Sequence, residues 1–449
     1  MTGRRVVVTG LGAVSAAGVG LRPLLEALHA GTSQTRRIVG FDPSGFPCQV
    51  AGEVLDFSAR GFVPKSYRKA VKVMARDIEL AVAAADLAFR DAAMATPGMN
   101  GTGEGGGAAT TVGGYDGSRV ACNIGAGLIC ADLNELGAAI QTSLDEHHRL
   151  DFARWGREGM NNLTPLWLLK YLPNMLACHV TIIHALKGPS NTITCGEASA
   201  LLSIAEAASQ IARGDADAAI AGGAETKLNP MGLLRQGKLG RLTTNANDAP
   251  GQACRPFDSG HAGTVLGEGA GLLVLEEADC AVRRGARIYA ELVGFGAAAD
   301  PSGCDPHARH CGNFHLACRR ALEDAGIGAG QLDLVIAHGT GVPHEDTLEA
   351  ARLSEMLEPG SAEVLALTGA IGDTHAAAGA LGAAVAATAL FEQKVPASVN
   401  FDSPAADCQS LRVSRQSHER TLRYALVECF SHAGQSAAAV LKTFEGGPA

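Results

Sequence analysis

The amino-acid sequence predicts an α/β fold assembled from two similar halves. Strand-like runs of β-branched and aliphatic residues alternate along the chain with helix-like runs, which is the pattern of a sheet covered by helices. Residues 193–214, ITCGEASALLSIAEAASQIARG, and residues 370–393, AIGDTHAAAGALGAAVAATALFEQ, also echo each other, since each places a polar turn before a helix of small residues. Helices faced with Ala and Gly approach closely, so we expect these two to pack together at a pseudo-symmetric centre.

The individual elements follow from local composition. Strands are expected where short apolar runs meet turn residues, and helices where apolar residues recur at helical spacing. The expected strands are residues 5–8, 119–124, 218–221 and 334–337, and the expected helices are residues 21–29 and 198–213. The stretch 95–114, ATPGMNGTGEGGGAATTVGG, is predicted to be a flexible surface loop because it is rich in Gly and Thr. We expect one structural unit whose halves, 1–255 and 256–449, divide at Arg255-Pro256-Phe257-Asp258.

Composition argues against several classes of protein. With 449 residues, 47% of them hydrophobic, the chain can bury a large core, and its net charge of −9 without a run of Lys or Arg disfavours a nucleic-acid partner. Twelve scattered cysteines without a CxxC pair predict reduced thiols in a cytoplasmic compartment. Residues 6–8, followed by Thr-Gly-Leu-Gly, indicate a buried strand entering a turn, in preference to a signal peptide. The longest apolar segment, residues 376–391, is mostly Ala and Gly, so we expect a buried helix and no membrane span.

The stretch 191–200, NTITCGEASA, is typical of a strand that runs into a tight turn and then a helix, which is how folds display a nucleophile. Two residues compete for the display position, Cys195 with its thiol and Glu197 with its carboxylate. A helix N-terminus offers unpaired N–H groups and positive dipole character, so it can stabilise an anion or hold an oxyanion. The residues alone leave both candidates open.

Two further turns carry candidate acid–base groups. His338, in AHGTGVPHED, follows the expected strand at 334–337 and is a candidate acid, base or hydrogen-bond donor. Asp373, in Gly372-Asp373-Thr374-His375, begins the second small-residue helix. There it is either part of a site or simply a helix cap.

Neither a metal nor a nucleotide cofactor is expected. Five potential metal ligands lie on separate turns: His338, His344, Asp346, Asp373 and His375. They lack the HxxxH or HExxH spacing that places ligands on one helix face. Gly10-Leu11-Gly12 opens like a dinucleotide fingerprint, but Ser15 occupies the place of the third glycine.

These segments together resemble the β-ketoacyl-acyl carrier protein synthases, condensing enzymes with a thiolase-like αβαβα fold of two pseudo-repeated halves. The resemblance covers nearly the whole chain and runs in the family's order through RRVVVTGLGAVS, LPNMLACHV, KGPSNTIT, DADAAIAGGAE, CRPFDSGHAGTVLGEGAGLLVLE, ARIYAELVGFG, AHGTGVPHED and ECFSHAGQSAAAVL. In active members, as the resemblance implies, a cysteine at the first helix N-terminus takes the acyl chain from a carrier protein as a thioester. Two histidines then assist malonyl decarboxylation and carbon–carbon bond formation, and backbone N–H groups hold the oxyanion.

The resemblance assigns the nucleophile position to Glu197, since the family's cysteine falls nine residues after Gly188, whereas Cys195 falls two short. It identifies His338 as the first catalytic histidine. It places Asp373 where the second histidine belongs.

The positions around these residues also depart from the family. Thr368 stands where the family has a lysine, and His375 lies two residues beyond the second-histidine position. The family's Phe-Gly-Phe-Gly-Gly gating loop reads Phe-Ser-His-Ala-Gly over 430–434, so only Phe430 and Gly434 carry over.

A carboxylate at position 197 cannot form the thioester that carries the growing chain. The altered site therefore predicts a ketosynthase-like protein of fatty-acid or polyketide assembly that does not extend chains, similar to the chain-length factors that pair with an active synthase. An ionised Glu197 would also repel a malonyl carboxylate, which disfavours decarboxylation unless burial keeps Glu197 protonated. One alternative is an enzyme that transfers, condenses or decarboxylates acyl groups with Cys195, or with Glu197 and His338, in an unfamiliar arrangement. Another is a scaffold that binds the carrier protein without an acyl tunnel.

The resemblance also suggests partners. Family members are dimers, so we expect a homodimer or a heterodimer with an active ketosynthase. The stretch PKSYRKAVKVMAR gathers cations at the i, i+3 and i+4 spacings of a helix face. These cations are Lys65, Arg68, Lys69, Lys72 and Arg76. In related synthases a basic helix in this region receives the acidic acyl carrier protein, and the alternative is an ordinary solvated helix face.

Overall fold

The computed structural model describes residues 3–99, 111–302, 314–358 and 360–446. The main strands of its amino-terminal half are β1 (Val6–Ser15), β2 (Gly18–Val19), β7 (Val120–Ala126), β8 (Ser190–Ile193), β9 (Ala218–Glu225) and β11 (Gly269–Glu277). Those of its carboxy-terminal half are β12 (Ala290–Ala299), β13 (Leu334–Ala337), β14 (Glu363–Ala366), β17 (Tyr424–Phe430) and β18 (Gln435–Lys442). Small sheets join β3 (Arg36–Arg37), β4 (Val50–Gly52) and β10 (Leu266–Gly267), β5 (Thr111–Val112) and β6 (Tyr115–Asp116), and β15 (Lys394–Val395) and β16 (His418–Glu419).

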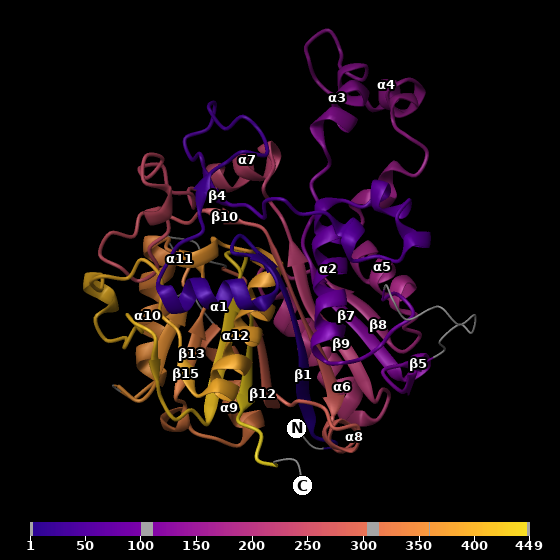
Figure 1. Ribbon diagram of the computed structural model, residues 1–449. Coiled ribbons are helices and arrows are strands. Elements are labelled where there is room, and N and C mark those ends of the chain that lie inside the picture. The colour runs from indigo at the N-terminus through magenta and orange to yellow at the C-terminus, as the bar shows by residue number, and fades with distance from the viewer. Residues whose placement is uncertain (1–2, 100–110, 303–313, 359, 447–449) are drawn as a thin grey trace.

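The helices fall close to the expected positions. Their bounds are α1 (Leu21–Ala30), α2 (Arg76–Asp91), α3 (Leu133–Gln141), α4 (Phe152–Arg157), α5 (Met175–His184), α6 (Ser199–Arg213), α7 (Pro230–Lys238), α8 (Ala278–Arg283), α9 (Phe314–Ala325), α10 (Pro343–Met356), α11 (Thr368–Ile371) and α12 (Ala378–Glu392). The helices predicted at 21–29 and 198–213 differ from α1 and α6 by one residue each. Figure 1 shows a central sheet with helices packed around it, and α3 and α4 on a segment that projects away from it, which confirms the α/β class.

The central sheet has eleven strands, and its two halves repeat one topology. Numbered within each half, the strands follow the order 1-5-4-2-3, as β1-β11-β9-β7-β8 and as β12-β18-β17-β13-β14. In each half the first two neighbouring pairs are antiparallel and the last two are parallel. The halves join where β1 pairs with β12 through residues 6–8. This duplicated topology is the thiolase-like architecture that the resemblance implied.

The repeat places the boundary between the halves later than the sequence suggested. β11 is the fifth strand of the first half and pairs with both β1 and β9, yet it lies beyond residue 255. We therefore propose a boundary between β11 and β12, in place of the division into 1–255 and 256–449.

Three large hydrophobic clusters fill the space between the central sheet and the helices that cover it. The largest lies between the half-sheets and includes most of α6 and α12, the second lies under α2 and α5, and the third lies under α9 and α10. Successive residues of β13 point alternately into the first and third clusters, as expected for a strand covered on both faces. The small residues of α12 permit close packing, because a Cβ on Gly379 would lie 2.6 Å from Leu201 Cγ of α6.

The first strand is longer than expected, since the turn predicted after residue 8 is part of β1. A Cβ on Gly10 would lie 2.4 Å from the Ala88 carbonyl oxygen, and one on Gly12 would lie 2.0 Å from that of Ala84. These glycines therefore let α2 pack directly against the strand. Their role in packing accounts for the partial resemblance to a dinucleotide fingerprint.

The apolar segment near residue 376 is a buried helix, as expected. The 3-10 turn η9 (His375–Ala377) continues directly into α12. By length and composition alone this 18-residue segment, with a mean hydropathy of 1.3, would also be compatible with a membrane span, but 83% of it is buried inside the protein. Most of the predicted loop at 95–114, residues 100–110, lies outside the described residues.

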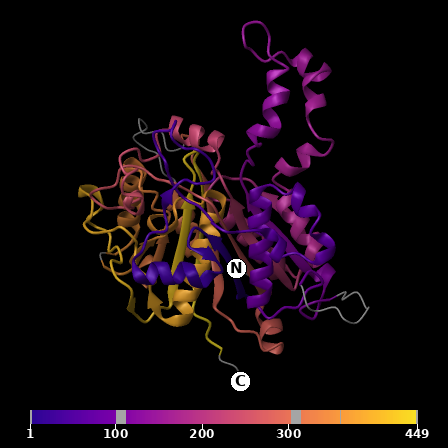
Figure 2. The ribbon, with the colours of Figure 1, turned by 45° about the horizontal axis from the view of Figure 1, so that its top comes forward.

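A helical arm projects from the body between β7 and α5, as Figure 2 shows. It carries α3 and α4, and the Asp151 carboxylate caps α4 by accepting the N–H groups of Ala153 and Arg154. At its foot, Lys170 and Tyr171 both bind the Glu135 carboxylate.

Candidate active site

The predicted nucleophile turn spans residues 194–198, between the end of β8 and the start of α6. Ser199 closes the turn, because its hydroxyl accepts the Cys195 N–H at 2.8 Å and donates to the Gly196 carbonyl at 2.6 Å. Gly196 has a φ of 57°, a left-handed conformation that favours glycine. The Glu197 residue that follows is buried, with 2% of its surface exposed.

Cys195 also lies in this turn, two residues before Glu197 and beyond the end of the preceding strand. Strand β8 ends at Ile193, and Cys195 forms an isolated bridge with Glu197. Its side chain is half-buried and packs against the core between the half-sheets. Burial raises the pKa of the thiol. The thiolate that nucleophilic attack requires is therefore disfavoured.

Arg241 joins three buried carboxylates in the site. Its Nε and Nη2 donate to Glu345 at 2.9 and 3.1 Å. Its Nη1 lies 3.5 Å from Glu197 Oε1, and its Nη2 lies 3.4 Å from Asp373 Oδ2. These four residues, together with His375, which contacts two of the carboxylates, form what we call the ion cluster.

His375 belongs to the site although it lies two residues beyond the family's second-histidine position. Its Nδ1 lies 3.4 Å from both Glu197 Oε1 and Asp373 Oδ2. The residue has a φ of 50°, and its N–H donates to Asp373 Oδ1 at 2.9 Å. Asp373 therefore binds the backbone of this turn and is also a member of the ion cluster, although the N-cap position itself is occupied by Thr374.

Neighbouring charges lower the pKa values of two carboxylates of the ion cluster, Glu197 and Asp373. Burial alone raises the pKa of Glu197, but the hydrogen bond with His375 and the charges of Arg241 and Lys227 outweigh it and hold the pKa well below its ordinary value. Burial likewise opposes ionisation of Asp373, yet His375 and Arg241 lower its pKa. Glu197 is therefore expected to be ionised at neutral pH. Burial does not keep it protonated, so its charge would repel a malonyl carboxylate.

A second ion pair joins the partly exposed Lys227 to the buried Glu225. Lys227 Nζ contacts Glu225 Oε1 at 2.7 Å, and Glu225 Oε2 accepts the Ala376 N–H at 2.9 Å. This pair ties the end of β9 to the start of the second small-residue helix. The two helix starts that echo each other in the sequence are thus held together by charge as well as by packing.

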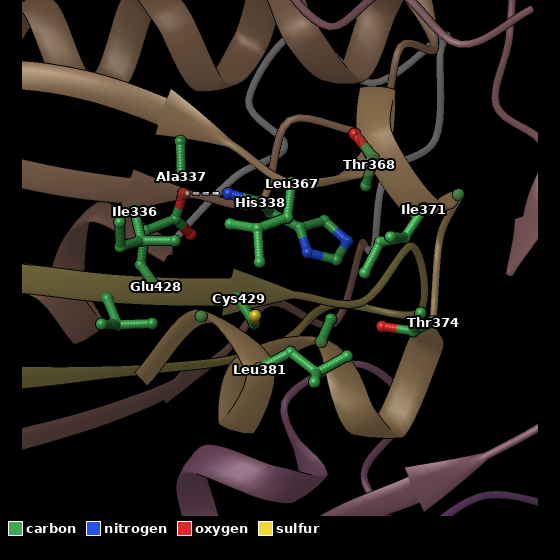
Figure 3. Close-up of a pocket in the computed structure, with 14 residues that line it drawn as sticks. Ile336, Ala337, His338, Leu367, Thr368, Ile371, Thr374, Leu381, Glu428 and Cys429 are labelled. Carbon is green, nitrogen blue, oxygen red and sulfur yellow. Dashed lines mark hydrogen bonds between the residues drawn. The ribbon is translucent and has the colours of Figure 1, made fainter. Parts of the chain in front are cut away.

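His338 follows β13 and is 3% exposed. Its backbone N–H is shared between Glu349 Oε1 at 2.8 Å and Glu428 Oε1 at 3.1 Å. The imidazole packs against the Phe430 ring with 5.1 Å between centroids, and Figure 3 shows it projecting into a cavity of about 20 Å³. His338 also contributes to lowering the pKa of Asp373, which places the two residues in one electrostatic environment.

The carboxy-terminal loop covers the nucleophile turn. Phe430 ends β17, and Gly434 has a φ of 96°. Between them Ser431 lies so close to Gly196 that a Cβ on the glycine would be 2.6 Å from the Ser431 hydroxyl. Burial lowers the pKa of His432, and Glu197 acts in the opposite direction. The residues that replace the family's loop sequence therefore face the altered nucleophile position.

Two of the potential metal ligands considered from the sequence lie apart from the ion cluster. His344 is exposed on α10. Asp346 accepts the N–H groups of Phe257 and Gly341, so it supports the turn that carries His338.

A different trio has the geometry to hold a metal ion. The ligand atoms of Glu197, Asp373 and His375 lie within 4.8 Å of one another. Arg241 already contacts two of the three, and a cation bound there would have to displace its guanidinium. That the site requires no metal stays a prediction.

The basic stretch does not form the expected helix face. It folds into two short 3-10 turns, η2 (Lys65–Tyr67) and η3 (Ala70–Val73), and the α-helix begins only at Arg76. Arg76 itself pairs with Glu268 at 2.9 Å and leaves the predicted surface. The four other cations are exposed: Lys65, Arg68, Lys69 and Lys72.

Sequence reasoning missed the cations that hold the site together, Arg241 and Lys227, and their respective partners Glu345 and Glu225. Arg241 lies in QGKLGRLTTN, a segment that no motif singles out. Charge balance was the available signal, because two carboxylates predicted for one buried site require a buried cation.

Comparisons with known proteins agree with this architecture. Residues 3–281 match the family model of the β-ketoacyl synthase N-terminal domain, and residues 289–402 match that of the C-terminal domain. The chain is 34% identical to a 3-oxoacyl-[acyl-carrier-protein] synthase 2 of Vibrio harveyi over 98% of this chain and 99% of that protein. It is similar to the ishigamide ketosynthase/chain length factor, with a TM-score of 0.79, 26% identity and coverage of 99% and 100% of the two chains. The solved structure of a type II PKS acyl-carrier protein in complex with its ketosynthase contains a chain with the same fold. That match has a TM-score of 0.81, 22% identity and coverage of 99% of this chain and 100% of the other.

Proposed function

This chain belongs to the β-ketoacyl synthase family, and from that premise we propose that it serves fatty-acid or polyketide assembly as a non-extending partner of an active ketosynthase, in the manner of a chain-length factor. The observation that carries the proposal is the state of Glu197. At the position that the resemblance assigns to the nucleophilic cysteine, the chain has a buried, ionised carboxylate 3.5 Å from Arg241 and 3.4 Å from His375. A carboxylate has no sulfur atom, so it cannot carry an acyl chain as a thioester.

The second-histidine position supports the same conclusion. Asp373 occupies it and is bound to Arg241, so it offers negative charge where the family places a hydrogen-bond donor. A malonyl group carries a carboxylate, and an ionised Glu197 and Asp373 would both repel it.

The two edge strands of the central sheet, β14 and β8, bear on where a partner chain would bind. At one end β14 is covered, since Val364 pairs with Val413. At the other end β8 is the terminal strand, and its residues Ser190 and Asn191 are exposed. An open strand edge is a template for pairing with another chain, so we place the contact of a homodimer or heterodimer at β8.

An acyl carrier protein is the proposed second partner. The four exposed cations of η2 and η3 and their flanks form a local basic patch on a chain whose net charge is −9. Within the described part of the chain none of them has an ion-pair partner, so the patch is available to an acidic protein. We place this assembly in the cytoplasm, in keeping with the ten described cysteines, which are all free.

A second candidate function is acyl transfer or condensation by this chain itself. Its relationship to a 3-oxoacyl-[acyl-carrier-protein] synthase 2 favours this candidate, and the half-buried thiol of Cys195 lies in the nucleophile turn. The raised pKa of Cys195 and the ion pairs of Glu197 weigh against it.

Intact mass measurement and peptide mapping distinguish the two functions. The purified protein is incubated with an acyl-loaded carrier protein and, separately, with a thiol-directed ketosynthase inhibitor. We expect no adduct on Cys195 and no difference between the wild type and Cys195→Ser. An acyl or inhibitor adduct that maps to Cys195 and disappears in Cys195→Ser would overturn the non-extending role.

A further inference from the structure

Two buried carboxylates converge on a single backbone N–H behind His338. Glu349 Oε1 and Glu428 Oε1 lie 2.8 and 3.1 Å from the His338 nitrogen, and Glu349 Oε2 accepts the Gly339 N–H at 2.9 Å. Glu349 comes from α10 and Glu428 from β17, and their exposed fractions are 0% and 1%. Both carboxylates therefore accept the same His338 N–H.

Among the described residues, no lysine or arginine forms an ion pair with these two acids. The titratable groups that face it are Asp346 on α10, Cys318 on α9, Cys429 on β17 and His338 itself. The acid and the thiols supply no positive charge. Thr368, at the position where the family has a lysine, donates its hydroxyl to the Gly339 carbonyl and is likewise neutral.

Two buried carboxylates that accept the same N–H resist double ionisation, because like charges and burial each favour the protonated form. We propose that Glu349 and Glu428 share one proton at neutral pH, and that this protonated pair positions the turn carrying His338. The glutamates are positioning residues, since they act on His338 through its backbone. Burial and the neighbouring Glu428 raise the pKa of Glu349 well above its ordinary value, in agreement with this arrangement.

The cavity beside His338 gives the pair access to the imidazole. Glu428, His338 and Thr374 line it, and Figure 3 shows the imidazole directed into it. Neither His338 ring nitrogen nor Glu428 Oε2 has a hydrogen-bond partner among the described residues. A volume of about 20 Å³ admits one water molecule, which is sufficient to relay a proton between the acid and the imidazole.

A shared proton makes the folding stability depend on pH in one direction. A carboxyl whose pKa is higher in the folded than in the unfolded protein makes folding take up a proton, so stability falls as pH rises from the ordinary pKa of Glu towards the folded value. At alkaline pH the shared proton is lost, and two anions then face the same His338 N–H. We expect the His338 turn to shift in the same pH range.

Infrared spectroscopy of the full chain tests the shared proton directly. The wild type at neutral pH is expected to show the C=O stretch of a buried protonated carboxyl, and Glu349→Gln/Glu428→Gln is expected to lose it. Glu355→Gln is the matched control, because Glu355 lies on the same helix but its side chain is 60% exposed; it should leave the band unchanged. A wild type without a protonated-carboxyl band at neutral pH would overturn the proposal.

A titration of the wild type provides a test that needs no folded variant of the pair. The carboxyl band should disappear as pH is raised, and the NMR signals of the His338 imidazole, assigned from His338→Asn, should shift over the same range. Loss of the band without any shift of the His338 signals would show that the pair has only a structural role, and the positioning proposal would then be wrong.

Discussion

Arg241 and Glu345 form a two-pronged ion pair in which Nε and Nη2 of the guanidinium reach the two carboxylate oxygens at 2.9 and 3.1 Å. Both side chains are nearly inaccessible to solvent, with 3% and 1% of their surfaces exposed. Such parallel donation fixes the plane of the guanidinium as well as its charge. The remaining face of Arg241 is thereby directed towards Glu197 and Asp373.

Replacing Arg241 should destabilise the protein strongly. Arg241→Met leaves three buried carboxylates without their shared cation, and breaking a buried pair costs ~3–5 kcal/mol. Urea unfolding measures the loss. Arg22→Met is the control, because Arg22 pairs with Glu26 on the surface and should change stability by less than ~0.5 kcal/mol. Equal effects of the two substitutions would show that the ion cluster contributes no more than a surface pair.

The contribution of Glu197 to stability should depend on pH in one direction. Its pKa is lowered in the folded protein, so the ionised side chain stabilises the fold above the ordinary pKa of Glu, and this contribution disappears as pH falls through the folded value. Glu197→Gln should therefore lower the melting temperature at pH 7, and the gap from the wild type should close in strong acid. A gap that widens on acidification would contradict the assignment of charge.

Restoring the family's nucleophile should not restore chain extension. Glu197→Cys supplies a thiol, but Asp373 still stands at the second-histidine position and remains paired with Arg241. We expect no condensation product when this variant is assayed with acyl-loaded and malonyl-loaded carrier proteins. Product formation by the single variant would mean that Asp373 does not prevent catalysis.

The contact between Gly196 and Ser431 can be measured as a coupling energy. Gly196→Ala introduces strain at a φ of 57° and a Cβ only 2.6 Å from the Ser431 hydroxyl. Ser431→Gly should relieve the clash but not the strain, giving a coupling of ~1 kcal/mol in a double-mutant cycle. Gly31→Ala isolates the strain, because Gly31 has a φ of 63° and a Cβ added there would meet nothing within 4 Å. If the changes in stability caused by Gly196→Ala and Ser431→Gly are additive, the carboxy-terminal loop moves away from the added Cβ without a cost in free energy.

Carrier-protein binding should depend on the basic patch. Lys69→Glu/Lys72→Glu is expected to weaken binding of an acyl carrier protein, with a smaller difference from the wild type at high salt because exposed charges are screened. Calorimetry at two salt concentrations measures the effect, and Arg22→Glu serves as the control because Arg22 is an exposed cation on α1, outside the patch. Unchanged binding at low salt would refute docking at this surface.

Features encoded locally could be predicted from the sequence. The ends of α1 and α6 follow from periodicity and turn residues, and the packing of α6 on α12 follows from their small side chains. The turn predicted at Gly10 and Gly12 was wrong, because these glycines accommodate Ala88 and Ala84 of α2, each more than 70 residues away in the sequence. The basic stretch misled because charge spacing does not determine whether the backbone forms an α-helix or 3-10 turns.

The composition of the site was harder to predict because it depends on backbone direction. Counting residues places His375 outside the catalytic pattern, but its φ of 50° and the hydrogen bond from its N–H to Asp373 bring its ring to Glu197. Arg241 could not be recognised by spacing, since its three partners lie 44, 104 and 132 residues away. The contacts with Glu345 and Asp373 join the two halves, so they exist only once the halves are docked.

The ion cluster has a consequence for folding kinetics, because its members come from both repeats of the topology. Glu197 precedes a helix of the first repeat, whereas Glu345 and Asp373 belong to the second, so Arg241 cannot bind all three until both half-sheets have formed. Interactions of such large sequence separation are expected to be absent from the transition state for folding. Their loss then accelerates unfolding and leaves the folding rate nearly unchanged. The charges of the ion cluster are thus expected to lengthen the lifetime of the native state.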